Sequence, residues 1–496
     1  MHAISGTMLR DLLVCERRLG LDLHADPSLR DTTSPFVRML WADGLAHEEQ
    51  VLEAMIDRDM VDLRGLPRSE RERGTIAAIA GASSAIMGAV ITHADLIGMP
   101  DLLLRIDGGY MALDVKGGSA TAGPGDAYKE EYLVQVAHYA FILERSGLGR
   151  GDVAGIIDRQ RRRIDYDLAL PFGRDRLDGA ARHARALEAA RAIRDGAATR
   201  GAISAQCGLC DWRSLCAREL RQADDLTRVA GLGRALRPAI ETIAPNVAAL
   251  ARVPPPPSGA PTGLPGVGSE RLARFIDRAR LLADPAAGPI LREPLGLPDA
   301  GHVVDFDVEA DPVRGLVYLH GFWHEGGHEG VDGFVHFFAE TPDQAGERDA
   351  FARAIEHFRR HRDAHWFHYS AYERTAYMGL ARRHPDVCGD DEIRAIFEPS
   401  RCTDLYAVIS RRTDWPLSSY SIKAVAKACG FAWDDPTPGG AASIEWYDRY
   451  VRTGDAALRE RIVAYNRDDV RASAHVRAAL AELERTGRIG RFRRPS

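Results

Sequence analysis

The stretch GMPDLLLRIDGGYMALDVKGG, residues Gly98 to Gly118, decides the fold of the first part of the chain. Within it, two short apolar runs, Leu102–Ile106 and Tyr110–Leu113, flank the tripeptide Asp107-Gly108-Gly109. An Asp-Gly pair between runs of this kind is typical of a tight turn that joins two antiparallel strands. The stretch therefore predicts a β-hairpin.

Charged side chains stand at one end of the predicted hairpin. Pro100-Asp101 begins the first strand, and Asp114-Val115-Lys116 ends the second. Because alternate residues of a strand share a face, Asp114 and Lys116 point the same way and can converge with Asp101. Two carboxylates can hold a hard cation such as Mg2+, and a lysine beside them can orient or activate a water. The arrangement favours a metal-dependent hydrolytic site, and a surface hairpin with ordinary charges is the alternative.

Two helical patterns on either side of the hairpin strengthen the first interpretation. Gly44-Leu45-Ala46-His47 precedes the hairpin on a helical pattern. Gln135 and Tyr139 follow it on a predicted helix over Glu130–Glu144, where residues four apart share a face. In their order and spacing these motifs resemble the RecB-like branch of the PD-(D/E)XK nuclease superfamily over about residues 1–220.

The resemblance assigns roles to the residues that match its motifs. It implies that three side chains ligate a divalent metal: His47, Asp101 and Asp114. It also implies that Lys116 orients the attacking water and that Gln135 and Tyr139 position the site or the strand. The sequence thus predicts a first catalytic centre.

Composition is ordinary for a soluble globular protein of two or three domains, with 496 residues, 45% hydrophobic and 27% charged. The net charge of −6 means that any surface for nucleic acid must be local, as around Arg159–Arg163.

The uncharged run Thr75–Thr92 is rich in Ala, Gly and Ser, so it favours a helix and a buried strand over Ala89–Thr92, not a membrane span. Met1–Leu13 lacks the apolar core of a signal peptide. We expect a cytoplasmic protein that does not bind membranes.

Seven cysteines are present, and a cytoplasmic cluster of them indicates metal rather than disulfides. Cys207, Cys210 and Cys216 are compact, whereas Cys15 lies far upstream. The spacing of these cysteines alone does not decide between zinc and an iron–sulfur cluster, and it does not indicate that Cys15 is a fourth ligand. A subset of RecB-like nucleases carries one cysteine before the core and three after it, and these hold a [4Fe-4S] cluster. The resemblance implies such a cluster here, with zinc or unligated cysteines as alternatives. The scattered cysteines are expected to be small buried hydrophobes: Cys388, Cys402 and Cys429.

Residues 221–298 form a different, helical region. Val229–Gly233 and Gly263–Gly268 are glycine turns that each precede a helical pattern, the second over Ser269–Leu282. The run Pro254–Pro257 between them indicates a stiff linker. A glycine turn before a helix exposes backbone N–H groups that can hold a phosphate. The turns resemble helix-hairpin-helix elements, which implies contact with DNA backbones, and plain helix–turn connections are the alternative.

Residues 299–496 combine strands with acidic helices. Alternation over Val304–Val308 predicts a strand on which three acidic residues share one face: Asp305, Asp307 and Glu309. Gly315–Trp323 predicts the next strand, and Trp366–Tyr369 a third that leads into a helix carrying Glu373. Carboxylates spread over a sheet and helices can assemble a two-metal site that activates a water and stabilises a leaving oxygen.

The acidic pattern resembles the DEDDy exonucleases of the RNase H-like superfamily. Asp307 and Glu309 match the D-x-E motif, and Tyr465 and Asp469 match Y-x3-D on one helical face. Glu373 stands where an aspartate is usual, and its extra methylene moves the carboxylate by more than about one ångström. The resemblance implies that two metals are held by Asp307, Glu309, Glu373 and Asp469, with Tyr465 assisting. A decayed site in a structural domain is the alternative.

The predicted fold class is α/β, in three parts. Residues 1–220 are expected to form a restriction-endonuclease-like PD-(D/E)XK domain with the iron–sulfur cluster, 221–298 a small helix-hairpin-helix-like region, and 299–496 an RNase H-like DEDDy 3'-5' exonuclease-like domain. This order resembles a bacterial family of predicted RecB-like nucleases.

The combined motifs predict a metal-dependent DNA nuclease that uses Mg2+ or Mn2+. We expect an exonuclease acting on single-stranded or processed DNA ends, in DNA repair, recombination or defence. The chain contains no G-x4-G-K-[ST] phosphate loop, so duplex unwinding is expected from a helicase partner in trans. Two alternatives are an RNA-processing exonuclease that uses mainly the C-terminal site and a nucleic-acid-binding adaptor that does not cut.

Overall fold

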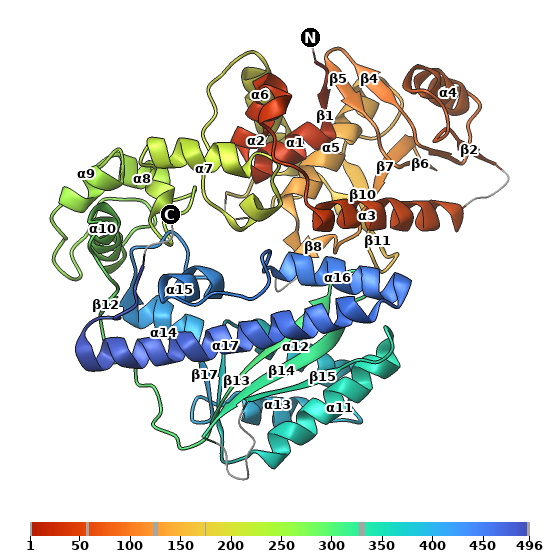
Figure 1. The fold of residues 1–496 in the computed structure, drawn as a ribbon. Helices are drawn as coiled ribbons and strands as arrows, with labels where there is room; N and C mark the ends of the chain where they lie inside the picture. Colours follow the sequence, from red (N-terminus) through yellow and green to blue (C-terminus); the bar gives the residue numbers. More distant parts are fainter. Residues whose placement is uncertain (1, 56–58, 123–126, 174, 327–332, 494–496) are drawn as a thin grey trace. The chain divides into compact units, whose positions relative to one another are not determined.

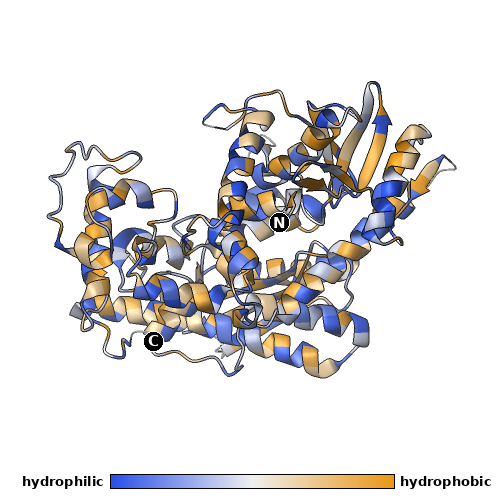
Figure 2. Cartoon of the chain, turned by 90° about the horizontal axis from the view of Figure 1, so that it is seen from above, coloured by the Kyte–Doolittle hydropathy of each residue, from blue (hydrophilic) through white to orange (hydrophobic). Residues whose placement is uncertain are grey.

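The computed structural model describes residues 2–55, 59–122, 127–173, 175–326 and 333–493. The chain divides into two compact units, Met1–Glu219 and Leu220–Ser496, whose elements are labelled in Figure 1. Helices of both units alternate between hydrophilic and hydrophobic residues, as expected of helices that cover a core with one face (Figure 2). No helix within the described ranges is long and apolar enough to cross a membrane.

The first unit is built on a mixed six-stranded sheet in the order β11-β10-β7-β6-β3-β2. Its strands are β2 Met60–Asp62, β3 Ala85–Met87, β6 Leu102–Ile106, β7 Gly109–Val115, β10 Val153–Ile157 and β11 Arg163–Asp167. β6 and β7 are antiparallel, with Ile106 opposite Gly109, so the predicted hairpin is confirmed. β7 continues the sheet by pairing with β10 in parallel. The end of β7 therefore lies inside the sheet, between two neighbours.

Smaller strands complete the first unit. One three-stranded sheet joins β1 Ile4–Ser5, β5 Leu96–Gly98 and β4 Ile91–His93. A further pair is formed by β8 Thr121–Ala122 and β9 Ala127–Tyr128. The strand predicted over Ala89–Thr92 thus begins at Ile91, and the two residues before it are buried.

Helices cover both faces of the six-stranded sheet. The helices up to the boundary between the units are α1 Gly6–Val14, α2 Glu16–His24, α3 Pro35–Glu53, α4 Arg68–Ala80, α5 Glu130–Arg145, α6 Gly179–Arg194 and α7 Arg213–Gln222, with 3-10 turns η1 Pro27–Leu29 and η2 Ala205–Leu209, and α5 and α3 are the two that pack on this sheet. Ala112 of β7 packs in the core formed with α5, whereas Leu113 packs in a second core with Val51 and Leu52 of α3. Because side chains alternate along β7, the strand is held between α5 and α3. The helix predicted over Glu130–Glu144 is confirmed as α5.

The second unit contains a five-stranded sheet in the order β15-β14-β13-β16-β17. Its strands are β13 Val303–Asp311, β14 Leu316–Glu325, β15 Gly333–Phe338, β16 His365–His368 and β17 Cys402–Asp404. The first three are antiparallel neighbours, and β16 and β17 run parallel to β13. The three strands predicted from the sequence are confirmed as β13, β14 and β16, although Gly315 precedes β14 and Tyr369 follows β16.

Opposite faces of β13 have opposite chemistry. Phe306 and Val308 pack into an apolar core with α11 Gln344–Arg360, α12 Tyr372–Arg383 and α13 Asp390–Ile396. On the other face, Asp305 and Asp307 accept hydrogen bonds from α17 Ala456–Thr486, the long helix that crosses this sheet in Figure 1. The remaining helices of this part are α14 Leu405–Arg412, α15 Ile422–Ala428 and α16 Gly440–Thr453. The predicted acidic face of β13 is therefore confirmed.

The helical region packs in the same compact unit as this sheet. Its helices are η3 Leu226–Arg228, α8 Arg237–Glu241, α9 Val247–Arg252 and α10 Ser269–Ala283, and they share one apolar core. β12 Ile290–Leu291 and β18 Thr413–Asp414 form a small antiparallel pair. The buried carboxylate of Asp414 accepts hydrogen bonds from two arginines of α10, from Arg274 over 3.1 Å and from Arg278 over 2.6 Å. The run Pro254–Pro257 lies between α9 and α10, so it joins two packed helices and does not mark the division between the compact units.

Candidate active sites

The three charged residues of the hairpin converge as predicted. The main-chain N–H of Val115 donates to Asp101 Oδ2 over 2.7 Å, and that of Asp101 lies 3.4 Å from Asp114 Oδ1. Lys116 Nζ donates to Asp114 Oδ2 over 2.7 Å. β6 starts where β7 ends, so the antiparallel pairing itself brings Asp101 beside Asp114. The hairpin thus presents two carboxylates and an ammonium at one edge.

The charges of this first centre are strongly coupled. Burial raises the pKa of Asp101 well above its usual range, and the neighbouring carboxylates of Asp114 and Glu48 raise it further. Burial alone would lower the pKa of Lys116, but Asp114 and Asp101 outweigh it, so the lysine pKa is raised. The carboxylates of Asp101, Asp114 and Glu48 thus lie in one another's field, and a gathering of carboxylates of this kind fits a divalent cation.

α3 contributes a carboxylate that the sequence analysis did not single out. Burial raises the pKa of Glu48, and Asp114 is the next largest cause, so the Glu48 side chain lies in the field of the hairpin acids. The neighbouring His47 is buried, and its Nε2 lies 3.3 Å from the carbonyl oxygen of Asp158. Both residues stand on α3, and the sequence His47-Glu48-Glu49 alone could not tell which side chain faces the hairpin.

α5 places the predicted Gln135–Tyr139 pair next to the first centre. Gln135 Nε2 donates to the Tyr139 hydroxyl over 3.0 Å, and both side chains are buried. Burial raises the pKa of Tyr139 well above its usual value, followed by Asp114. Gln135 Oε1 is buried and finds no hydrogen-bond partner within the described ranges. A buried amide oxygen beside the acidic pair without a protein partner is a position where an internal water or ion is expected to bind.

The four cysteines predicted to act together are neighbours in space. Cys15 separates α1 from α2, Cys207 lies in η2, and Cys210 and Cys216 follow. Burial raises the pKa of Cys216 to about 12, and Cys15 and Cys207 are the next causes. All four thiols therefore share one neighbourhood, and crowded thiols of this kind are a donor set for a metal or a cluster. The three remaining cysteines, Cys388, Cys402 and Cys429, are buried, as predicted.

The second centre lies between β13 and α17. One carboxylate oxygen from each of Asp307, Glu309 and Asp469 can be chosen so that all three lie within 4.8 Å of one another. Burial raises the pKa of Asp307 and of Glu309 well above their usual ranges, and nearby carboxylates add to the effect. Buried acids at this spacing repel one another unless they share protons or a cation. The group therefore fits one or two divalent ions.

Glu373 reaches this centre from the first turn of α12. Its carboxyl group is hydrogen-bonded to Asp307, and His368 Nδ1 lies 3.3 Å from Glu373 Oε2. Burial raises the pKa of Glu373 to about 8. A glutamate at this position thus meets Asp307 directly.

Tyr465 and Asp469 are linked on α17, and two residues that the sequence analysis missed hold them. The Tyr465 hydroxyl donates to Asp469 and accepts from Lys423 Nζ over 2.6 Å. Trp433 Nε1 donates to Asp469 Oδ1 over 2.6 Å. Lys423 lies on α15 and Trp433 in the loop that follows. Only the tertiary packing of this loop and helix on α17 reveals them.

The hydrogen bonds of Asp305 and Asp307 show which of these two carboxylates is open to a metal ion and which is held in an ion pair with α17. Asn466 Nδ2 donates to Asp307 Oδ2 over 2.9 Å and is fully buried. Asp305, on the same face of β13, accepts from Ser473 Oγ over 2.8 Å and from Arg477 Nη2 over 2.9 Å. Asp305 is therefore engaged in an ion pair with α17, whereas Asp307 faces the acidic group.

Two family models match the chain, one in each unit. Residues 18–217 match the sequence model of the PD-(D/E)XK nuclease superfamily, and residues 304–481 match the RNase_H_2 model of the RNase H superfamily. No curated protein matches the chain in sequence. The protein is an α/β enzyme with an N-terminal PD-(D/E)XK domain and a C-terminal RNase H-like domain. Both domains are of nuclease superfamilies, so it is a phosphodiester hydrolase, and domains of this class act on nucleic acid with divalent metal.

Proposed function

We propose that this nuclease cleaves DNA at two metal-dependent centres and acts as an exonuclease on single-stranded or processed ends. The observation that carries the proposal is the gathering of Asp307, Glu309 and Asp469 within 4.8 Å, with Tyr465 bonded to Asp469. The DNA substrate is supported by the resemblance of residues 1–220 to RecB-like nucleases. The chain acts in DNA repair, recombination or defence, with a helicase partner in trans unwinding any duplex.

In the first centre, Asp101, Asp114 and His47 hold Mg2+ or Mn2+. The cation supplies charge stabilisation at the phosphate and lowers the pKa of an attacking water. Lys116, held by Asp114 over 2.7 Å, orients that water and offsets developing negative charge. Gln135 and Tyr139 position the site or the nucleic-acid strand, and their mutual hydrogen bond of 3.0 Å fixes the tyrosine hydroxyl beside the acidic pair. Glu48 joins the acidic group as a further ligand candidate.

In the second centre, Asp307, Glu309, Glu373 and Asp469 hold two divalent ions. Two ions stabilise both the attacking and the leaving oxygen of an in-line displacement. Asn466 holds Asp307 and Trp433 holds Asp469, so both carboxylates are oriented before substrate arrives. Tyr465 orients the water through its hydroxyl. Glu373 acts in place of the usual aspartate because α12 brings its carboxyl group to Asp307.

The four cysteines hold a [4Fe-4S] cluster in this proposal. Within the described ranges, the two groups of three ligand atoms that gather within 4.8 Å contain no cysteine. Zinc would bring its thiolates to about 3.8 Å from one another, given Zn–S bonds of about 2.3 Å. A four-iron cluster is larger and takes thiolates that stand farther apart. The cluster links Cys15 near the start of the first domain to Cys216 near its end.

The helical region, residues 221–298, contacts the DNA backbone as helix-hairpin-helix elements. Gly231 and Gly266 have φ of +82° and +72°, a conformation that glycine adopts without strain. These turns lie ahead of α8 and α10. In this proposal the chain has three functional parts. Residues 1–220 and 299–496 cleave DNA, and the region between them binds the DNA backbone.

Labelled single-stranded DNA, duplex DNA and RNA of one sequence test the proposal, each with Mg2+, with Mn2+ or with chelator. We expect metal-dependent shortening of DNA, fastest on single strands. Cleavage of RNA alone would overturn the proposal in favour of an RNA-processing exonuclease. Binding without cleavage under every condition would overturn it in favour of an adaptor. An Asp114→Ala, Asp307→Ala double variant controls for contaminating nucleases.

A further inference from the structure

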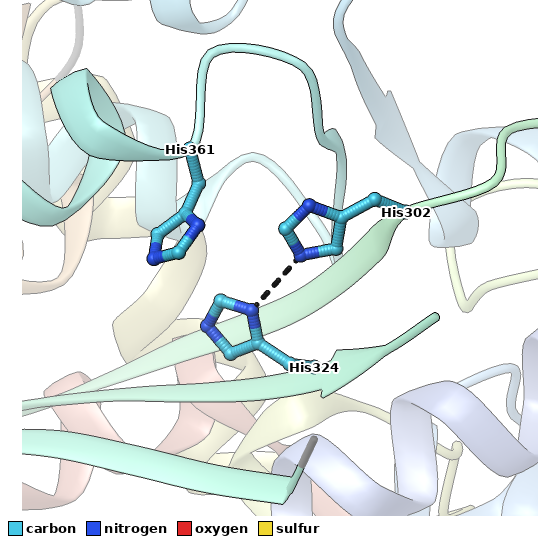
Figure 3. Close-up of side chains that lie close together, drawn as sticks. All are labelled: His302, His324 and His361. Atoms are coloured by element: carbon cyan, nitrogen blue, oxygen red, sulfur yellow. Dashed lines mark hydrogen bonds between the residues drawn. The ribbon is translucent and has the colours of Figure 1, made fainter. Parts of the chain in front are cut away.

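Three histidines from separate elements of the second unit converge at one end of its sheet. His302 immediately precedes β13, His324 lies near the end of β14, and His361 follows the last residue of α11 (Figure 3). One ring nitrogen of each can be chosen so that all three lie within 4.8 Å of one another. His302 and His324 are buried and His361 is half-buried, so the group has one side open toward solvent.

The buried rings are oriented as in metal sites, where one ring nitrogen faces the ion and the other is hydrogen-bonded to a neighbouring side chain. His302 Nε2 lies 3.1 Å from His324 Nδ1, the contact dashed in Figure 3. On its other side, His302 Nδ1 lies 3.3 Å from Asp363 Oδ2. A ligating histidine that donates its second N–H to a carboxylate is the usual arrangement at zinc sites, because the carboxylate fixes the ring and raises its basicity.

His324 has an outer partner of its own. Its Nε2 lies 2.8 Å from His357 Nε2, on the last turn of α11. The rings of His302 and His324 thus face each other through one nitrogen each, and their second nitrogens face Asp363 and His357, respectively. Zn–N bonds of about 2.0–2.1 Å place tetrahedral ligands about 3.3 Å apart, close to the spacing of His302 and His324.

We propose that His302, His324 and His361 form a site for a transition-metal ion, with Zn2+ as the first choice. Imidazole nitrogens suit zinc, copper and nickel, whereas Mg2+ and Ca2+ take oxygen ligands. Three protein ligands leave the fourth tetrahedral position to a water.

This site is separate from the nuclease centres. Asp307 lies five residues beyond His302 on the extended chain, which places the two about 17 Å apart at roughly 3.3 Å per residue. The nitrogen ligands also select a different metal from the carboxylate group. The zinc site therefore does not depend on whether the proposed nuclease activity is correct.

The effect of metal binding is structural. The start of β13 and the end of β14 already pair in the sheet, with Val304 opposite His324, and a bound ion would join the end of α11 to this pair. β13 carries Asp307 and Glu309, so its start is fixed by the same ion. Because the ion binds the folded site and not the unfolded chain, it stabilises the second unit by mass action.

Cobalt titration of the untagged, full-length protein in excess Mg2+ tests the site. We expect one Co2+ per chain with visible d–d bands of a tetrahedral nitrogen site, displaced by one equivalent of Zn2+. Binding by the cysteines would instead give a thiolate-to-cobalt charge-transfer band. His361→Ala, at a half-buried position, should abolish the d–d bands without unfolding the protein. His336→Ala on β15, outside the group, is the matched control and should leave them unchanged.

Thermal unfolding supplies the second readout. Zinc at about 100 times its Kd should raise the Tm of the wild-type second unit by about 5 °C, and by about the same in His336→Ala. His361→Ala should lose this shift. Absence of stoichiometric nitrogen-type cobalt bands in the wild type, or equal binding by His361→Ala, would show that the rings form only a hydrogen-bonded chain. Failure here leaves the cleavage assays unaffected, so the two proposals fail separately.

Discussion

Lys423 donates a hydrogen bond from Nζ to the hydroxyl oxygen of Tyr465 over 2.6 Å. The tyrosine oxygen is thereby used as an acceptor, and its own proton goes to Asp469. The lysine also favours the charged forms of Asp307 and Asp469. A residue from α15 thus sets the direction of the tyrosine hydroxyl in the second centre, and Lys423 is a positioning residue for this centre.

Replacement of Lys423 by Met should slow cleavage at the second centre by about 10- to 100-fold, since misplacement of a catalytic group by about 1 Å can cost that much. The loss should appear in kcat, measured on single-stranded DNA with the first centre disabled by Asp114→Ala. Lys427→Met, exposed on the same helix, is the control. If Lys423 acts through Tyr465, adding Lys423→Met to Tyr465→Phe should cost little more. Fully multiplicative losses would contradict the coupling.

The two centres should be separable. Asp114→Asn keeps the shape of the side chain but removes the charge that holds Lys116, so it should abolish cleavage at the first centre and leave the second. Asp307→Asn should do the reverse. Product lengths from each variant, with matched Mg2+ and Mn2+ series, measure this. If either single change silences all cleavage in a folded protein, one working centre replaces the two-centre proposal.

Iron should be present in anaerobically purified protein. We expect a brown colour, broad visible absorbance and roughly four irons per chain, as a four-cysteine cluster requires. Cys216→Ala should lose iron and lower the Tm of the first unit, because it removes the link to Cys15. Cys388→Ala, a buried cysteine outside the group, should keep iron and colour. Stoichiometric zinc without iron at the cysteines would refute the cluster.

Local patterns carried most of the fold prediction. The Asp-Gly turn fixed the hairpin, and the register Ile106 opposite Gly109 then brought Asp101 to Asp114. Alternation on β13 separated Phe306 from Asp307 correctly, because a strand has a strict two-residue period. These features depend on residues that are near in sequence, or on a pairing that one turn imposes.

Residues brought in by tertiary packing could not be predicted. Lys423 meets Tyr465 across 42 positions, and His324 meets His357 across 33. No period or motif links such pairs before the helices dock. The run Pro254–Pro257 indicated a linker because proline is stiff, but α9 and α10 on either side pack together and make it a loop within one unit. Composition describes the local chain and not what packs around it.

The stability of the metal-free second unit should depend on pH through Glu373. Burial raises the pKa of Glu373 from 4.5 to about 8, so the folded chain holds a proton that the unfolded chain releases between these values. The free energy of unfolding should therefore fall as pH rises from about 4.5 to about 8. Glu373→Gln should reduce this dependence and leave the part that Asp307 and Glu309 contribute, measured by denaturant unfolding in chelator. An unchanged slope in the variant would contradict the assignment.

Glu373→Asp tests whether the second centre is built around a glutamate. The wild-type carboxyl group is hydrogen-bonded to Asp307 and lies beside His368, so its position is set by the length of the side chain as well as by α12. An aspartate on the same backbone withdraws the carboxylate by about one methylene, and cleavage should fall by about 10- to 100-fold.

The measurement uses single-stranded DNA with the first centre disabled by Asp114→Ala, and Glu373→Gln serves as the variant that keeps length but loses charge. Both changes should slow turnover, and only Glu373→Asp should regain part of it at high Mn2+, because it retains a carboxylate that a cation can draw closer. A decayed domain would behave differently, since restoring the usual aspartate would then raise activity or leave it at background. Faster turnover in Glu373→Asp than in the wild-type residue would therefore show that the second centre is not a native, functional one.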